Sequence, residues 1–419
     1  MKIGDKIRYF RKQKGMTLKQ LSEDICSISY LSKIENNKEK PHQEVINKLF
    51  NRLGIPLEQD DPKQIEELNK ELDEWYEVIK NRDVNKAVEL EKTISEKLTN
   101  IESPSILTKY NLFSIRYQLL LGNLDKSKSI INRLQEQNNN FSVEHKYYFN
   151  YFNGLYHYLL DDFIESLKYS SKAERINQTL QVNEPELYYL LAITHSRLNH
   201  VTLAIQYTNI AFELFNQKLN YIRSAECQII MAINYIRIRD LEKADYYLGN
   251  VLQLAEKLKD DYLLSNTYHN LGYLHSMKGE PQTAIEYYHK SLKYKEENEG
   301  YLNTIYYIIQ EYFTIGKIDK VNEWIEKGLE LTNENNKYYV KINVLKSILS
   351  LSKKDNDKKE AHKYIEEKAI PYFIKKQFWR EVSEYAEKLA DYYNSDGHYK
   401  KSSQYYKLAN DARKKIYVR

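Results

Sequence analysis

One helical hairpin is repeated along most of the chain, and this repeat limits the possible fold more than any other feature. It is clearest in residues 266–292, NTYHNLGYLHSMKGEPQTAIEYYHKSL, where two amphipathic segments flank Lys278, Gly279, Glu280 and Pro281. Glycine ends the first helix, and proline suits the first turn of the second. A single hairpin cannot bury its apolar face alone, so this segment predicts similar neighbours.

Small or compact residues recur at the position that Ala284 occupies, shortly after the hairpin turn. They are spaced by 37 to 41 residues and are Ala87, Ser127, Ser166, Ala204, Ala244, Ala284, Val321, Ala361 and Ser402. With Gly272 and Tyr288, the spacing of small and large residues resembles the tetratricopeptide pattern. We therefore predict an all-α fold in which about nine hairpins form a right-handed superhelical solenoid, with the first helix of each pair lining a concave groove.

Composition indicates an intracellular protein. No apolar run approaches the roughly 20 residues that span a bilayer, and the N-terminal residues lack the apolar region of a signal peptide. Two cysteines, Cys26 and Cys227, suit a reducing compartment as ordinary thiols. We expect a cytoplasmic location and no membrane contact.

The sequence shows no recognisable catalytic or metal-binding motif. Its ten histidines show no metal-ligand spacing; for example, His195 and His200 are five residues apart. A phosphate-cradling glycine-rich loop and a G-x-S-x-G elbow are both missing, and only 12 glycines are present. We predict no catalytic residue, no metal and no cofactor, and hence no enzyme.

Positive charge is concentrated at the N-terminus. Residues 1–58 contain 12 lysines and arginines against seven acids, a formal net charge of +5, whereas the rest of the chain carries −1. In this segment apolar spacing predicts four short helices. Ile3, Ile7 and Phe10 mark one face of the first, Thr17 caps the second, the third covers residues 28–36, and the fourth lies near residues 43–53. A tight turn between the second and third makes a helix-turn-helix.

Residues 3–41, IGDKIRYFRKQKGMTLKQLSEDICSISYLSKIENNKEKP, resemble the Xre/lambda-repressor type of helix-turn-helix. The resemblance implies that the third helix enters the major groove of a double-stranded DNA operator. It also implies that Leu31 and Ile34 are core residues and that Glu35 is a structural acid. The residues expected to contact DNA are Thr17, Lys19, Gln20, Ser27, Ser29, Tyr30, Ser32, Lys33, Asn36, Asn37 and Lys38. Because a net charge of +5 is modest, two copies on a two-fold operator are expected.

A polar, proline-bounded stretch follows this segment and predicts a domain boundary. We expect a DNA-binding domain at residues 1–59, a linker at 60–64 and a repeat domain at 65–419. The combination resembles the peptide-sensing regulators of the Rap/Rgg/NprR/PlcR/PrgX family, nearest its NprR and PlcR branches. That resemblance implies a short signalling peptide in the groove, whose binding changes oligomeric state, as a homodimer or higher oligomer, or DNA affinity.

Side chains on the first helices are the expected peptide contacts. Asparagine and glutamine can satisfy both a donor and an acceptor of an extended peptide, and arginine can bind a carboxylate in a bidentate manner. The residues predicted to bind peptide are Asn234, Asn270, Gln310, Arg197, Arg237, Tyr189, Asn266, His269, Tyr273 and Tyr306.

Two other functions fit the same sequence. The repeats could bind a response regulator of a phosphorelay, as the resemblance to Rap proteins implies. Alternatively, they could serve only to dimerise a constitutive repressor, in which case no ligand would change its assembly.

Overall fold

A computed structural model of the chain describes residues 3–55, 61–99, 101–136, 138, 141–182, 184–350 and 362–417. Within these ranges every regular element of more than one turn is a helix and none is a strand, which confirms the all-α prediction. The chain divides into two compact units, Met1–Val182 and Asn183–Arg419. Among the residues that the structure describes, none of the helices combines the length and the hydrophobicity that a membrane-spanning segment requires.

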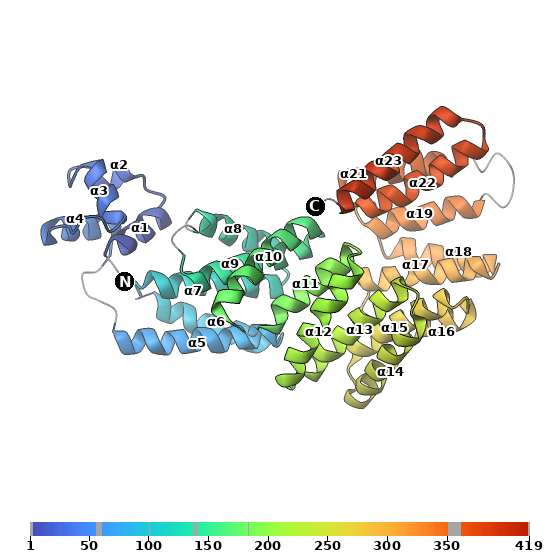
Figure 1. Cartoon of the computed structure of the whole chain (residues 1–419), viewed down its shortest axis with the longest axis horizontal. Coiled ribbons are helices and arrows are strands. Elements are labelled where there is room, and N and C mark those ends of the chain that lie inside the picture. Colours follow the sequence, from blue (N-terminus) through green and yellow to red (C-terminus); the bar gives the residue numbers. More distant parts are fainter. Residues whose placement is uncertain are drawn as a thin grey trace. The chain divides into compact units, whose positions relative to one another are not determined.

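The first four helices of unit 1 form a small head with its own core (Figure 1). They are α1 (Ile3–Gln13), α2 (Leu18–Ser22), α3 (Ile28–Glu35) and α4 (Gln43–Leu53). Leu31 and Ile34 are buried, as predicted, whereas Ile3, on the face of α1 that also carries Ile7, is 44% exposed. Helices α1 and α3 approach so closely that a Cβ on Gly4 would lie 2.0 Å from the Ile34 carbonyl oxygen.

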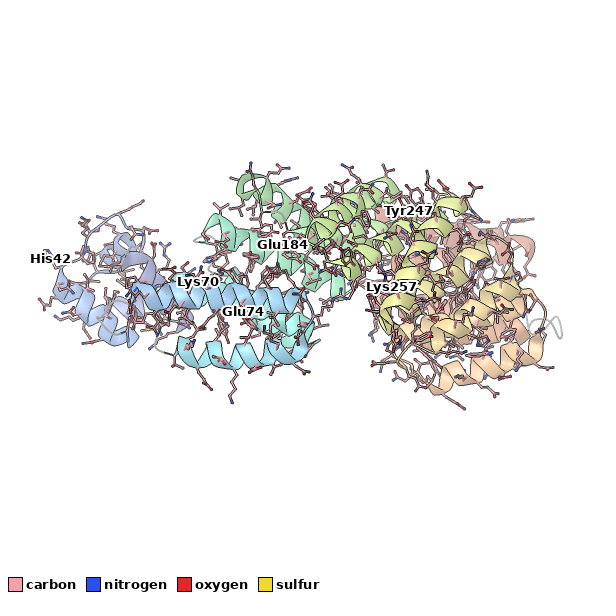
Figure 2. All side chains as sticks on the ribbon, turned by 90° about the horizontal axis from the view of Figure 1, so that it is seen from below. His42, Lys70, Glu74, Glu184, Tyr247 and Lys257 are labelled. Atoms are coloured by element: carbon pink, nitrogen blue, oxygen red, sulfur yellow. The ribbon has the colours of Figure 1, made fainter. Side chains whose placement is uncertain are left out.

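Three helix pairs complete unit 1. They are α5 (Pro62–Lys80) with α6 (Val84–Leu98), α7 (Pro104–Leu120) with α8 (Leu124–Gln135), and α9 (Val143–Leu159) with α10 (Phe163–Leu180). Large aromatic residues join them: the Trp75 indole N–H donates to the Ala87 carbonyl at 2.9 Å, and Tyr76 stacks on Phe113 with ring centroids 4.5 Å apart. Lys70 and Glu74 lie one turn apart on α5 (Figure 2).

Unit 2 continues the pairing. Its elements are α11 (Pro185–Arg197), α12 (Val201–Gln217), α13 (Tyr221–Arg237), α14 (Leu241–Leu258), α15 (Asp261–Met277), α16 (Pro281–Leu292), α17 (Glu299–Thr314), α18 (Ile318–Glu330), α19 (Lys337–Ser350), the π-helix η2 (Ile365–Ala369), α21 (Ile370–Lys375), α22 (Trp379–Ser395) and α23 (Tyr399–Tyr417). Each first helix from α11 to α17 contacts its own partner and the next first helix. Counted over the described residues of both units, the pairs number nine, with η2 and α21 together pairing with α19.

Burial explains the spacing of the small residues. Ala87, Ser127, Ser166, Ala204, Ala244 and Ala284 are fully buried, and Val321 and Ser402 are nearly so, which confirms the predicted register; position 361 lies outside the described residues. The close contact is visible at Gly272, where a Cβ would lie 2.6 Å from the buried ring of Tyr288.

Candidate DNA-binding surface and peptide-binding residues

Helix α2 begins with a complete capping box. The Thr17 hydroxyl accepts from the Gln20 backbone N–H at 3.2 Å, and the Gln20 side-chain oxygen accepts from the Thr17 backbone N–H at 2.8 Å. This reciprocal pair satisfies two amides that a helix start leaves open. Thr17, Lys19 and Gln20 are all exposed, so the predicted contacts of α2 lie on the surface and remain predictions.

Helix α3 presents a polar edge to solvent. Its cap, Ser27, accepts from the Tyr30 backbone N–H at 3.1 Å. Ser29 and Lys33 are exposed and are four residues apart, so they share one face of the helix. Ser27, Asn36 and Lys38 are exposed as well, whereas Ser32 and Tyr30 are half-buried, Tyr30 against the head core.

Two of the predicted DNA contacts are also used inside the head. Asn36 donates to the Ser32 carbonyl at 2.8 Å and accepts from the Arg8 guanidinium. Asn37 adopts a left-handed φ of 55° and donates to the Asp5 carboxylate at 2.8 Å. Asn36 remains exposed, but Asn37 serves the contact between α1 and the turn after α3.

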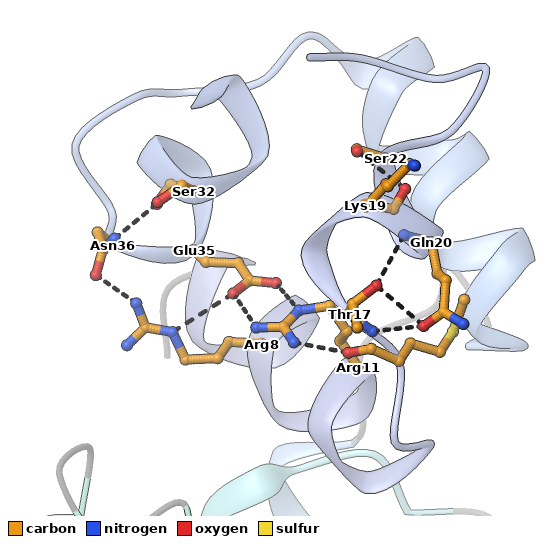
Figure 3. A network of polar contacts seen from close by, with 10 residues as sticks. Arg8, Arg11, Thr17, Lys19, Gln20, Ser22, Ser32, Glu35 and Asn36 are labelled. Atoms are coloured by element: carbon orange, nitrogen blue, oxygen red, sulfur yellow. Dashed lines mark hydrogen bonds and ion pairs between the residues drawn. The ribbon is translucent and has the colours of Figure 1, made fainter. Parts of the chain in front are cut away.

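Glu35 anchors α3 from behind this edge (Figure 3). It is only 2% exposed. The Arg11 guanidinium donates to both carboxylate oxygens, at 2.6 and 2.7 Å, and a further Arg11 N–H donates to the Met16 carbonyl at 2.8 Å. The Arg8 Nε lies 3.7 Å from the same carboxylate. Glu35 is therefore a structural acid, as predicted, and it fixes α3 to α1.

In unit 2, Asn234 joins α11 to α13. Its side chain is fully buried. Its amide donates to the Ser196 hydroxyl at 3.2 Å and to the Ile230 carbonyl at 2.8 Å, and its oxygen accepts from Arg237 at 3.2 Å. Arg237 also donates to the Ser196 hydroxyl at 2.8 Å. In this arrangement Asn234 positions Arg237.

The predicted residues of α15 differ in how far their polar groups are engaged. Asn266 donates to the Tyr262 carbonyl at 3.0 Å. His269 bridges to α17 through Thr304 at 3.0 Å and Asn303 at 3.2 Å, and burial, followed by the charge of Lys295, lowers its pKa well below the ordinary value. Asn270 donates to the Asn266 carbonyl at 2.8 Å, and its side-chain oxygen accepts no hydrogen bond within the described part of the chain.

Helices α17, α19 and α22 meet around Tyr306. The Gln310 amide donates to the Tyr306 hydroxyl at 3.2 Å. The Lys341 ammonium lies over the Tyr306 ring at 4.5 Å and 3.9 Å from the Glu381 carboxylate. Burial raises the pKa of Tyr306 above the ordinary value. Tyr306 and Gln310 therefore belong to one polar cluster that also contains Lys341 and Glu381.

Arg237 lies within the electrostatic reach of two further arginines. Burial, and then the positive charges of Arg380 and Arg197, lower the pKa of Arg237 to about 10, while Tyr273 and Tyr307 act in the opposite direction. The structure thus brings Arg197, Arg237 and Tyr273 into one neighbourhood. Tyr189 packs under the Arg223 guanidinium at 4.2 Å and against Phe215.

Sequence reasoning missed Arg380, Tyr307 and Lys341. Arg197 and Arg237 are 40 residues apart and each ends a first helix, so the repeat relates them. Arg380 lies instead at the start of α22. Its approach to Arg237 depends on how the intervening pairs wind, which no local pattern encodes.

The four-helix head and the stacked pairs together define a helix-turn-helix protein with a helical-repeat body. A family profile for the helix-turn-helix matches residues 7–59, and a tetratricopeptide-repeat profile matches residues 224–297. Residues 63–122 match a profile described as response regulator aspartate phosphatase H, N terminal.

The chain is 31% identical to the transcriptional activator NprA of Geobacillus stearothermophilus over 401 residues, which cover 93% of this chain and 98% of NprA. The chain belongs to the family of helix-turn-helix transcriptional regulators that includes NprA.

Two solved structures share its fold. NprR in complex with its cognate peptide NprX has a TM-score of 0.69 at 24% identity, over 83% of this chain and 98% of that one. A Rap protein complexed with competence and sporulation factor has a TM-score of 0.72 at 21% identity, over 84% of this chain and 99% of that one.

Proposed function

We propose that this chain is a transcriptional regulator of a quorum-sensing type that binds operator DNA through α2 and α3 and is controlled by a short signalling peptide bound by unit 2. The observation that carries the DNA-binding part is the exposed edge of Ser29 and Lys33 on a helix that the buried Glu35 fixes in place. A helix held rigidly with its polar face outward is suited to the major groove. Operator binding places the protein in the cytoplasm.

The peptide-binding part is supported by the arginines of unit 2. Burial lowers the pKa of Arg237 most, and the positive charges of Arg380 and Arg197 lower it further, so the three guanidinium groups repel one another. A carboxylate from a bound peptide would relieve this repulsion through charge-assisted hydrogen bonds. NprR, which shares the fold, has been solved with its cognate peptide. The proposed ligand is therefore a short peptide whose acidic side chain or C-terminus lies near Arg237.

The DNA-binding part is tested by selecting bound fragments from genomic DNA and footprinting them. A chain carrying Tyr30→Ala and Lys33→Ala should lose the footprint. Lys48→Ala is a matched control, because Lys48 is an exposed lysine on α4 that pairs with Glu44 at 2.7 Å, away from α3. Footprints that persist in the double variant would contradict the assignment of α3.

The peptide-binding part is tested separately by calorimetry with a selected peptide. Asn270→Ala should weaken peptide binding while operator binding by the unliganded chain stays measurable. Unchanged peptide affinity would show that Asn270 does not contribute to peptide binding. Light scattering on the same samples tests whether peptide shifts the assembly between a homodimer and a higher oligomer.

A second function is favoured by residues 63–122, which match the profile of a Rap N-terminal segment. These residues form all of α6 and α7 and all of α5 except its first residue, Pro62. We propose that they bind a response regulator of a phosphorelay. Retention of such a regulator on the immobilised full chain, with a change on addition of peptide, would support this role, and no retention in either condition would reject it.

A further inference from the structure

A pocket of about 250 Å³ lies between the head and the helix pairs of unit 1. One side is formed by α1, and the other by the N-terminal ends of α7 and α9. Contacts that hold α1 against these pairs include an ion pair between Lys6 and Glu102 and a hydrogen bond that Lys12 donates to the Glu136 carbonyl. A molecule in this pocket would touch two segments that are about 100 residues apart in the sequence.

The pocket has the electrostatics of an anion site. Helices α7 and α9 are each 17 residues long, and both point their N-terminal ends towards it. Unsatisfied amides and the helix dipole favour negative charge at such ends. The side chain of Ser103, the cap residue of α7, makes no capping hydrogen bond. Arg8 and Lys12 add two positive charges to the lining, and its one carboxylate, Asp5, accepts from Asn37.

Two buried side chains in the lining carry polar atoms that are not hydrogen-bonded. Thr108 is 5% exposed and His145 is 8% exposed. Neither side chain has a hydrogen-bond partner among the residues that the structure describes. Both residues line the pocket, so a molecule bound there can form hydrogen bonds with the Thr108 hydroxyl and the His145 ring without displacing a protein partner.

The His145 ring can act as a neutral donor. Burial, with the positive charge of Lys109 adding to it, lowers its pKa to about 4. At neutral pH the ring is therefore uncharged and carries one N–H. With the Thr108 hydroxyl, it offers donors from α7 and α9, while Arg8, which donates to Asn36, and Lys12, which donates to the Glu136 carbonyl, add positive charge from α1. Donors that converge from several directions suit a tetrahedral oxyanion better than a planar carboxylate.

We propose that this pocket binds the phosphate group of a small phosphorylated molecule. Its phosphate lies at the N-terminal ends of α7 and α9 between Lys12 and Thr108, and its carbon skeleton lies against the apolar wall of Pro104 and Phe141. Because the ligand touches both α1 and the helix pairs, it ties the head to the rest of unit 1. All residues that line this pocket belong to unit 1, so the proposal does not rest on peptide binding by unit 2.

The test is calorimetric titration of the full chain with inorganic phosphate and with glycerol 3-phosphate, at an ionic strength held constant with chloride. Thr108→Val removes the unpartnered hydroxyl with little change of volume and should weaken binding about tenfold or more. Thr93→Val is its control, since Thr93 is exposed on α6 and donates to the Glu89 carbonyl. Lys12→Gln is a second variant at a partly exposed position, with the exposed Lys14→Gln as its control.

The proposal is supported if either probe binds and its affinity falls in Thr108→Val and Lys12→Gln but not in the two control variants. Binding of both probes with equal affinity makes the phosphate group itself the recognised part, and tighter binding of glycerol 3-phosphate adds the carbon skeleton. No binding above the chloride-matched baseline, or equal affinity in Thr108→Val and Thr93→Val, would overturn the proposal.

Discussion

The head should lose most of its stability when Glu35 loses its main partner. Glu35 is 2% exposed and accepts two hydrogen bonds from Arg11, at 2.6 and 2.7 Å. Removing one member of a buried pair costs about 3–5 kcal/mol, because the other charge stays buried. Arg8 Nε, 3.7 Å away, can compensate in part, so the expected cost of Arg11→Ala is about 3 kcal/mol. A domain of some 50 residues has only about 3–8 kcal/mol in total.

Hydrogen exchange of the full chain, followed by mass spectrometry, measures this effect locally. In Arg11→Ala, a loss of about 3 kcal/mol corresponds to roughly 100-fold faster exchange of head amides if they open by unfolding of the head. Amides of α11 to α17 should be unaffected, because they belong to unit 2. The double variant Arg11→Met with Glu35→Leu should recover most of the protection, because it removes both charges of the buried pair.

Two results would refute this reasoning. Unchanged protection of α1 and α3 in Arg11→Ala would show that the ion pair does not hold the head. Equal loss of protection in the single and double variants would show that the Arg11 side chain acts through its packing or its bond to the Met16 carbonyl, and not by neutralising Glu35.

Two further predictions concern the packing at Gly272 and the dependence of stability on pH. Gly272→Ala places a methyl group against the buried Tyr288 ring and should destabilise unit 2 by about 1–3 kcal/mol, measured by urea unfolding. Gly249→Ala is the control, because nothing lies within 4 Å of its new methyl group, and it should stabilise unit 2 by up to about 1 kcal/mol. Equal effects of the two substitutions would contradict the close contact between Gly272 and Tyr288. The pKa of His145 is about 4 when folded, against an ordinary 6.5. The unfolded chain therefore takes up the proton first, and the free energy of unfolding of unit 1 should fall as pH drops from 6.5 towards 4. Urea titrations at stepped pH should show a shallower fall for His145→Gln, and an equally steep one would contradict the assignment.

Features that depend on neighbouring residues could be predicted from the sequence. The hairpin turn and the small residue after it recur with the repeat, so the burial of Ala204, Ala244 and Ala284 follows from spacing alone. The four helices of the head could also be predicted, because their apolar spacing and their ends depend on nearby residues. The capping box at Thr17, for example, is visible in the sequence as a threonine followed three residues later by glutamine.

Features that depend on how distant helix pairs pack against one another could not be predicted from the sequence. Asn234 has the composition of a peptide contact, but the approach of Ser196 from the preceding pair buries it beneath Arg237. Arg380 reaches Arg237 from a distant part of the repeat. The division into two compact units falls between the third and fourth helix pairs, at residues 182 and 183, where no change of composition marks it. The predicted boundaries at 59 and 65 remain a prediction.

The operator-binding isotherm of the full chain tests most directly whether peptide binding by unit 2 changes DNA binding by the head. It is measured by fluorescence anisotropy with and without a peptide that has been selected from a random library on the immobilised chain. A regulator of this kind should show an operator affinity that changes about 5- to 150-fold when peptide is added, and Asn270→Ala should abolish the change. Superimposable isotherms at saturating peptide would contradict the coupling between peptide binding and DNA binding.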